Sequence, residues 1–215
     1  MAAFIEPHLP SSEADPPVFV MGHSMGGGQV LTLLCDPAYG ERVTSRVRGW
    51  LLEAPFVAFP RGETPSALKV FAGRLAGRFL PRRQLKNTLP PENLCRVPEV
   101  VASLRDDELV HDTGTLEGLA SMLDRTAALA SGNVKAGEGV RALWMGHGTC
   151  DKGTSYEASK KWFDGCAGSV KDKTFRTYEG WYHQLHAEPE KEVFYREVAD
   201  WILARAGPEA TEAKL

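Results

Sequence analysis

The sequence has few cysteines, no long apolar run and little net charge. Its four cysteines lack the paired spacing of a metal site or a disulfide framework, so we expect free thiols in a reducing compartment: Cys35, Cys95, Cys150 and Cys166. No segment is apolar over the length of a membrane span, and the first ten residues have no basic leader or uninterrupted apolar stretch. The net charge of −3 gives no global reason to expect a nucleic-acid partner. We therefore expect a soluble, cytoplasmic protein.

The pentapeptide Gly-His-Ser-Met-Gly at residues 22–26 is the most informative motif in the chain. It follows the apolar run 18–21 and precedes the helical pattern 29–35, which predicts a sharp strand-to-helix turn with Ser24 at its apex. We expect the glycines at both ends of the pentapeptide to avoid steric clashes in this tight turn. The backbone N–H of Met25, at the start of the helix, is a predicted hydrogen-bond donor for an oxyanion.

Strand-like and helix-like segments alternate along much of the chain. Apolar runs at residues 18–21, 49–52 and 142–145 and a mixed segment at 174–178 predict four strands. Apolar periodicity predicts helices between and after them, at residues 29–35, 155–163 and 190–204. This alternation predicts an α/β fold with a mainly parallel sheet and helices on both of its faces.

The stretch 56–140 breaks this alternation, and we interpret it as a cap inserted between the second and third strands. It contains a proline pair and two helical patterns, at 66–79 and 116–129. The core would then consist of residues 1–55 and 141–206, and residues 207–215 would form a flexible tail.

The helical pattern at 66–79 has two open interpretations. It places apolar residues at helical spacing, and basic residues lie close to them: Leu68, Phe71, Leu75 and Phe79, with Lys69, Arg74, Arg78, Arg82 and Arg83. Such a helix either lies on a membrane or lipid-droplet surface and admits a lipid substrate, or packs on its own domain with its arginines in solvent.

A serine nucleophile needs a base within hydrogen-bond reach and an acid that orients the base. Asp151 follows the predicted strand 142–145, and His183 follows the predicted strand 174–178. Both residues would therefore lie beyond the carboxyl ends of parallel strands, where sites in such sheets form. The order serine, acid, histidine is the order of the α/β-hydrolase triad, so we expect Ser24, Asp151 and His183 to converge.

Four segments together resemble the monoacylglycerol lipase family of α/β-hydrolases, most closely its fungal members: 22–27, 106–119, 146–151 and 178–186. The resemblance extends over nearly the whole chain. It implies Ser24 as nucleophile, Asp151 as orienting acid and His183 as general base, acting on an acylglycerol ester through an acyl-enzyme without a cofactor. Serine aminopeptidase S33-type and lysophospholipase-like hydrolases share the pattern, so the substrate class stays open.

The resemblance also implies strands and a His-Gly loop upstream of Ser24, and this sequence does not contain them. We expect the chain to lack the N-terminal half of the fold, on the order of a hundred residues at about 30 per strand-helix-strand unit. The second oxyanion donor would be missing with it. The alternative function is a catalytically inactive fragment with an interaction role or none.

Three other polar residues are alternative members of the site. His23 could serve as the base, but its place inside a rigid turn favours a packing role. Glu53 follows the second predicted strand, the other place where this fold carries its acid, so it competes with Asp151. His147, in the predicted loop before Asp151, either supports that acid or takes part directly.

His183 and His186 are three residues apart and resemble half of a zinc site. No carboxylate or cysteine accompanies them at ligand spacing in the sequence, so we expect no metal. The sequence predicts neither the oligomeric state nor the acyl-chain and alcohol specificity.

Overall fold

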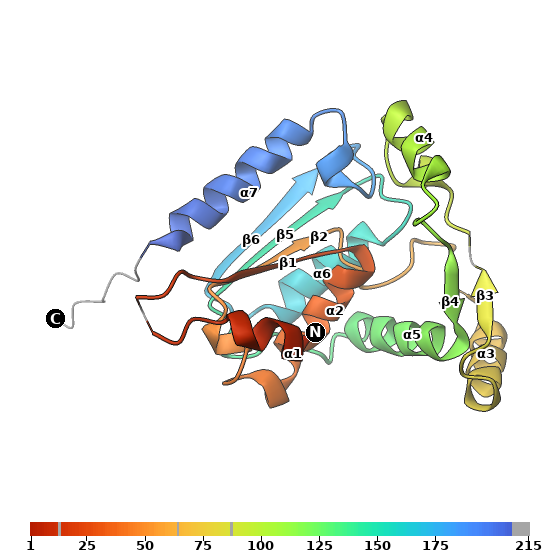
Figure 1. Cartoon of the computed structure of the whole chain (residues 1–215), viewed down its shortest axis with the longest axis horizontal. Coiled ribbons are helices and arrows are strands. Elements are labelled where there is room, and N and C mark those ends of the chain that lie inside the picture. Colours follow the sequence, from red (N-terminus) through yellow and green to blue (C-terminus); the bar gives the residue numbers. More distant parts are fainter. Residues whose placement is uncertain (13, 64, 87, 208–215) are drawn as a thin grey trace.

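A parallel four-stranded sheet forms the centre of the computed structural model, which describes residues 1–12, 14–63, 65–86 and 88–207, without the side chains of 67–69. The strand order is β1-β2-β5-β6, and every neighbouring pair is parallel (Figure 1). The strands are β1 (Phe19–His23), β2 (Gly49–Glu53), β5 (Ala142–Gly148) and β6 (Asp172–Tyr178). The four predicted strands and their parallel arrangement are confirmed.

Helices cover both faces of this sheet (Figure 1). On one face lie α2 (Ser24–Cys35), α5 (Leu116–Ala130) and α6 (Tyr156–Cys166), and on the other lies α7 (Lys191–Ala206). A short N-terminal helix, α1 (Ala2–Ile5), packs at the edge of the first face through Ile5. The described residues also form five single-turn 3₁₀ helices: η1 (Glu6–His8), η2 (Pro37–Tyr39), η3 (Thr44–Arg46), η4 (Pro91–Asn93) and η5 (Leu185–Ala187).

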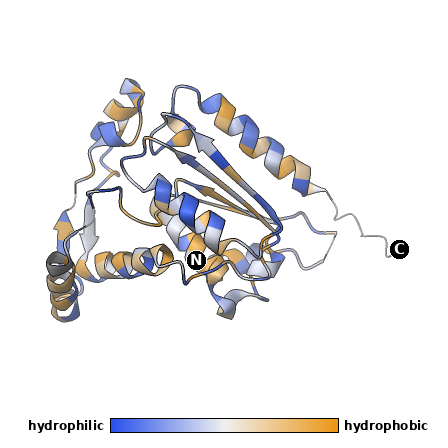
Figure 2. Cartoon of the chain, turned by 180° about the vertical axis from the view of Figure 1, so that it is seen from behind, coloured by the Kyte–Doolittle hydropathy of each residue, from blue (hydrophilic) through white to orange (hydrophobic). Residues whose placement is uncertain are grey.

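The central strands are buried on both faces because their alternate side chains enter two different apolar clusters. Leu52 and Leu143 point into the cluster formed with α2, α5 and α6. Leu51 and Trp144 point into the cluster formed with α7. All residues of β2 and β5 are buried, as expected for strands in the middle of a parallel sheet. Hydrophilic and hydrophobic residues alternate along α7 (Figure 2).

The described residues between β2 and β5 form three α-helices, the 3₁₀ helix η4 and a small antiparallel pair of strands. Besides α5 and η4, these elements are α3 (Ala67–Phe79), β3 (Gln84–Lys86), α4 (Pro98–Asp106) and β4 (Thr113–Thr115). The predicted helices 66–79 and 116–129 therefore match α3 and α5, whereas α4 and the β3–β4 pair were not predicted. Helix α5 packs against α3 and also reaches the core through Leu129.

Several predicted boundaries differ from the structure, and two of these differences concern the candidate site. Helix α2 begins at Ser24 rather than at residue 29, because the glycines of its first turns pack closely against the chain after β2. Strand β5 continues to Gly148 rather than ending at residue 145, so His147 lies in the strand and not in a loop. The side chains of Leu68 and Lys69 and the predicted tail beyond residue 207 lie outside the described residues.

Among the helices of the described ranges, none combines the length and the apolar character that a membrane span requires.

Candidate functional site

Ser24 lies at the turn between β1 and α2, as the sequence predicts. Its φ of 54° is in the left-handed region, which is uncommon for a residue other than glycine. The carbonyl oxygen of Ser24 accepts a hydrogen bond of 2.8 Å from the backbone N–H of Phe56, which fixes the turn to the chain after β2. Strained serines of this kind are typical of nucleophile elbows.

The glycines around the turn have different roles. A Cβ atom at Gly22 would lie 2.8 Å from Cγ2 of Val30, so a side chain at this position would clash, as predicted. At Gly26 no described atom lies within 4 Å of such a Cβ, apart from the helix's own backbone, so the same prediction is wrong for this residue. Gly27 is the crowded position instead, because a Cβ atom there would lie 2.9 Å from Cα of Pro55.

Met25 is the second residue of α2, so its backbone N–H belongs to the first turn of the helix. The N–H groups of a first turn have no acceptor within the helix, and they lie at the positive end of the helix dipole. This N–H is therefore placed beside Ser24 as the predicted oxyanion donor requires, while the methionine side chain is half exposed.

Asp151 and His183 meet beyond the carboxyl ends of β5 and β6. Nδ1 of His183 donates a hydrogen bond of 2.8 Å to Oδ2 of Asp151, and both side chains are buried. The other oxygen, Oδ1, accepts backbone N–H bonds from Gly153 at 2.7 Å and Thr154 at 2.9 Å. The carboxylate is thus held on both oxygens, and it fixes the orientation of the His183 ring.

Two more buried side chains bind Oδ2 of Asp151. Nε2 of His147 lies 2.9 Å from this oxygen, and the hydroxyl of Thr154 donates to it at 2.8 Å. Burial raises the pKa of Asp151, but the hydrogen bonds from His147 and His183 outweigh burial and hold this pKa well below its usual range. Asp151 is therefore an anion at neutral pH. Thr154 was not predicted from the sequence, although its place three residues after an aspartate is typical of a turn that binds the carboxylate.

His23 packs against the ring of His183, with 4.6 Å between the ring centroids. Its Nε2 lies 3.4 Å from the carbonyl oxygen of His183, which can only accept, so this nitrogen carries a proton. Burial lowers the pKa of His23 to about 4, which keeps the ring neutral at pH 7. The contact with His183 brings the neighbouring Ser24 to the same edge of the sheet. Within the described residues, however, no hydrogen bond joins the Ser24 hydroxyl to His183.

Glu53 binds His186 rather than His183. Its Oε1 accepts hydrogen bonds from the backbone N–H of His186 at 3.1 Å and from Nδ1 of the same residue at 2.7 Å. Burial raises the pKa of Glu53, but the bonds from His186 and the nearby His23 outweigh burial, and the pKa is lowered. The hydrogen bond from Glu53 raises the pKa of His186. Asp151, not Glu53, is therefore the carboxylate that contacts His183.

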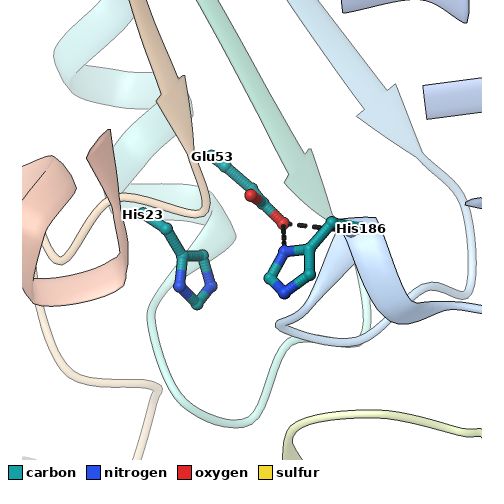
Figure 3. A group of neighbouring side chains, drawn as sticks. All are labelled: His23, Glu53 and His186. Atoms are coloured by element: carbon teal, nitrogen blue, oxygen red, sulfur yellow. Dashed lines mark hydrogen bonds and ion pairs between the residues drawn. The ribbon is translucent and has the colours of Figure 1, made fainter. Parts of the chain in front are cut away.

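A carboxylate accompanies His186 in space, although none does at ligand spacing in the sequence. Glu53 lies 133 residues earlier in the chain, so no local ligand spacing could reveal it. Together with His23 it forms a group of three possible metal ligands, whose ligand atoms all lie within 4.8 Å of one another (Figure 3).

Residues 1–190 match the protein family described as serine aminopeptidase, S33. A Schizosaccharomyces pombe protein provisionally named a monoglyceride lipase is 32% identical over 207 residues, which are 94% of this chain and 52% of the relative. A monoacylglycerol lipase of Mycolicibacterium smegmatis is 30% identical over 87% of this chain and 62% of its own length. The chain therefore spans about half to three fifths of the length of these relatives.

A solved structure gives the same result for the fold. The crystal structure of a monoacylglycerol lipase from Paleococcus ferrophilus superimposes with a TM-score of 0.73 and 29% sequence identity, covering 88% of this chain and 69% of that one. The parallel sheet with helices on both faces is thus the α/β-hydrolase fold.

Proposed function

Because the chain belongs to the serine aminopeptidase S33 family, we propose that it carries the catalytic site of a serine ester hydrolase that cleaves monoacylglycerol to fatty acid and glycerol. The observation that carries this proposal is the buried Asp151–His183 pair at the same edge of the sheet as the strained Ser24. The names of the S. pombe, M. smegmatis and P. ferrophilus relatives support the substrate class.

In the proposed acylation step, the Ser24 hydroxyl oxygen attacks the ester carbonyl carbon. Nδ1 of His183 is bound to Asp151, so Nε2 of the ring is the nitrogen that accepts the serine proton. The oxyanion that forms accepts a hydrogen bond from the N–H of Met25. When this intermediate collapses, the bond to glycerol breaks, and the glycerol oxygen takes the proton from His183.

In the deacylation step, a water molecule attacks the acyl carbon attached to Ser24. His183 accepts the proton of this water and returns it to the serine oxygen as the fatty acid leaves. Asp151 stays ionised throughout, and its charge stabilises the imidazolium that forms on His183 in both steps. Its buried position and low pKa suit this role.

We place the chain in the cytoplasm, in contact with a membrane or lipid droplet through α3. Phe71, Leu75 and Phe79 follow one another at intervals of four residues and are 65%, 50% and 73% exposed, so one face of this helix presents apolar side chains to solvent. Arg82 and Arg83 are exposed directly after the helix. Exposed apolar residues beside cations are typical of helices that lie on anionic lipid surfaces. We also interpret residues 56–140 as a cap that carries this helix.

Labelling with a fluorophosphonate probe tests the catalytic proposal, because the probe reacts with an activated serine and needs no particular substrate. We expect labelling of the chain, no labelling of Ser24→Ala and strongly reduced labelling of His183→Gln. Ser121→Ala is the matched control, because Ser121 is exposed on α5 and its hydroxyl makes no hydrogen bond in the described structure. A folded chain that is not labelled would favour the alternative, a catalytically inactive chain with an interaction role or none.

A substrate panel tests the substrate class separately. We expect glycerol release from monoacylglycerol to exceed the cleavage of phospholipids and of aminoacyl amides, and we expect Ser24→Ala to abolish it. Labelling without glycerol release would keep the serine hydrolase but refute the substrate.

Vesicle sedimentation tests the lipid contact. We expect the double variant Phe71→Ser/Phe79→Ser to lose binding to anionic phospholipid vesicles. Leu203→Ser is the control, because Leu203 on α7 is 70% exposed but far along the chain from α3. Equal binding by the two variants would contradict a contact through α3.

A further inference from the structure

Three side chains outside the proposed triad converge at the carboxyl edge of the sheet. His23 is the last residue of β1, Glu53 is the last residue of β2, and His186 lies in η5 beyond β6. Figure 3 shows the carboxylate of Glu53 directed at the ring of His186, with the ring of His23 beside them. One ligand atom of each residue lies within 4.8 Å of the other two.

We propose that His23, Glu53 and His186 form a binding site for one divalent transition-metal ion of the zinc type. Two imidazoles and one carboxylate are a common ligand set for zinc, and three protein ligands leave a fourth position for water. Bonds of 2.0–2.2 Å in tetrahedral geometry need ligand atoms about 3.3 Å apart. The ligand atoms of the three residues already lie within 4.8 Å of one another. Side-chain rotations would therefore bring them to this spacing without a change in the backbone fold.

The accessibility of the ligands also suits a metal ion. The side chain of His186 is 42% exposed, whereas that of Glu53 is 3% exposed, so an ion can enter from the solvent side and meet a buried anion. In the described part of the chain, the carboxylate of Glu53 accepts hydrogen bonds only from His186. No lysine or arginine there occupies the carboxylate, so its negative charge remains available to a cation.

The position of the site predicts its effect on catalysis. The ring of His23 contacts the ring of His183, and His186 follows His183 by three residues. A metal ion that joins His23 to His186 would restrain the loop that carries His183. We therefore expect the ion to inhibit ester hydrolysis rather than to support it.

Metal binding can be measured without catalysis, so this test is independent of the proposed function. Isothermal titration of the Ser24→Ala chain with ZnCl₂, in a buffer that does not chelate, should show one ion per chain. Co²⁺ should give the visible absorption of a tetrahedral complex. We expect His186→Gln and Glu53→Gln each to weaken Zn²⁺ binding at least about 10-fold, since the loss of even a supporting partner of a metal ligand costs that much.

Two control variants identify adventitious binding. His8→Gln removes an exposed histidine in η1, and Cys150→Ser removes the exposed cysteine, and both should bind Zn²⁺ as the parent chain does. If Glu53→Gln does not fold, the partly exposed His186→Gln decides the result. The proposal is wrong if no ion binds, if His186→Gln binds normally, or if Cys150→Ser abolishes binding.

Discussion

The contact between His147 and Asp151 allows a quantitative prediction for the variant His147→Ala. The His147 side chain is fully buried, and its Nε2 lies 2.9 Å from the Asp151 carboxylate. Its other ring nitrogen, Nδ1, is buried without a partner in the described structure, so the bond to Asp151 is the main polar contact of this ring. Replacement by alanine removes that bond and leaves a cavity.

The expected loss of stability follows from these contacts. A hydrogen bond to a charged group contributes about 1.5–3 kcal/mol. The edge contact between His147 and Tyr156, at 5.9 Å between centroids, contributes about 0.5–1.5 kcal/mol if it behaves like an aromatic pair. We therefore expect His147→Ala to lower the free energy of unfolding by about 2–4.5 kcal/mol. His147→Gln keeps an amide donor and should lose less than half as much.

The same variant should change the acid sensitivity of the fold. The pKa of Asp151 is lowered in the folded state, so its contribution to stability is present above the ordinary aspartate pKa of about 3.9 and is lost as the pH falls through the folded-state pKa. Without His147 that folded-state pKa is higher, so acid unfolding should begin at a higher pH.

Urea unfolding at pH 7, followed by acid titration of the circular dichroism signal, measures both effects. A loss below about 0.5 kcal/mol for His147→Ala would place it among ordinary surface substitutions and refute the argument. Equal losses for the alanine and glutamine variants would show that ring volume, not the hydrogen bond, accounts for the effect.

Three further predictions concern stability. Gly27→Ala should lower the free energy of unfolding in urea by about 1–3 kcal/mol, because the new Cβ atom would clash with the backbone of Pro55. Gly26→Ala should leave the free energy of unfolding unchanged, because the space around that position is open, and equal losses for the two variants would contradict this prediction. Because the pKa of buried His23 is about 4 against 6.5 when unfolded, the unfolded chain binds more protons between these values. Stability should fall by about 3 kcal/mol as the pH drops from 6.5 to 4, and His23→Gln should flatten this part of the profile. Thermal unfolding should show a loss of about 2–5 kcal/mol for the buried Leu143→Ala, but little change for the exposed Leu203→Ala.

The strands of the sheet could be predicted because three of them hold a short apolar run and the fourth, β6, holds the mixed segment 174–178 with Phe175 and Tyr178. In the middle strands β2 and β5 this run is buried on both faces, and the pattern alone indicates a parallel sheet. The end of β5 was missed because His147 and its neighbouring glycines carry no apolar pattern. They remain in the strand because β6 pairs with β5 as far as Gly148.

The β3–β4 pair and α4 could not be predicted for a different reason. Strands β3 and β4 have three residues each, and those of β3 are all exposed, so neither shows the alternation that marks a half-buried strand. Helix α4 contains no buried residue, and its only clear signal is Pro98 in its first turn. Short elements with little burial depend on tertiary contacts that local sequence does not encode.

The polar residues at strand ends contain more information than their spacing suggests. Glu53 ends an apolar strand and is 2% exposed, and His147 lies near the end of another and is fully buried. A buried polar group is costly unless it is hydrogen-bonded, so each such residue implies a partner elsewhere in the chain. Parallel strands bring their carboxyl ends to one edge, so partners are expected in the segments that follow the strands at that edge, as is the case for His186 and Asp151. A polar residue that ends an otherwise apolar strand therefore indicates a site before its partner can be identified.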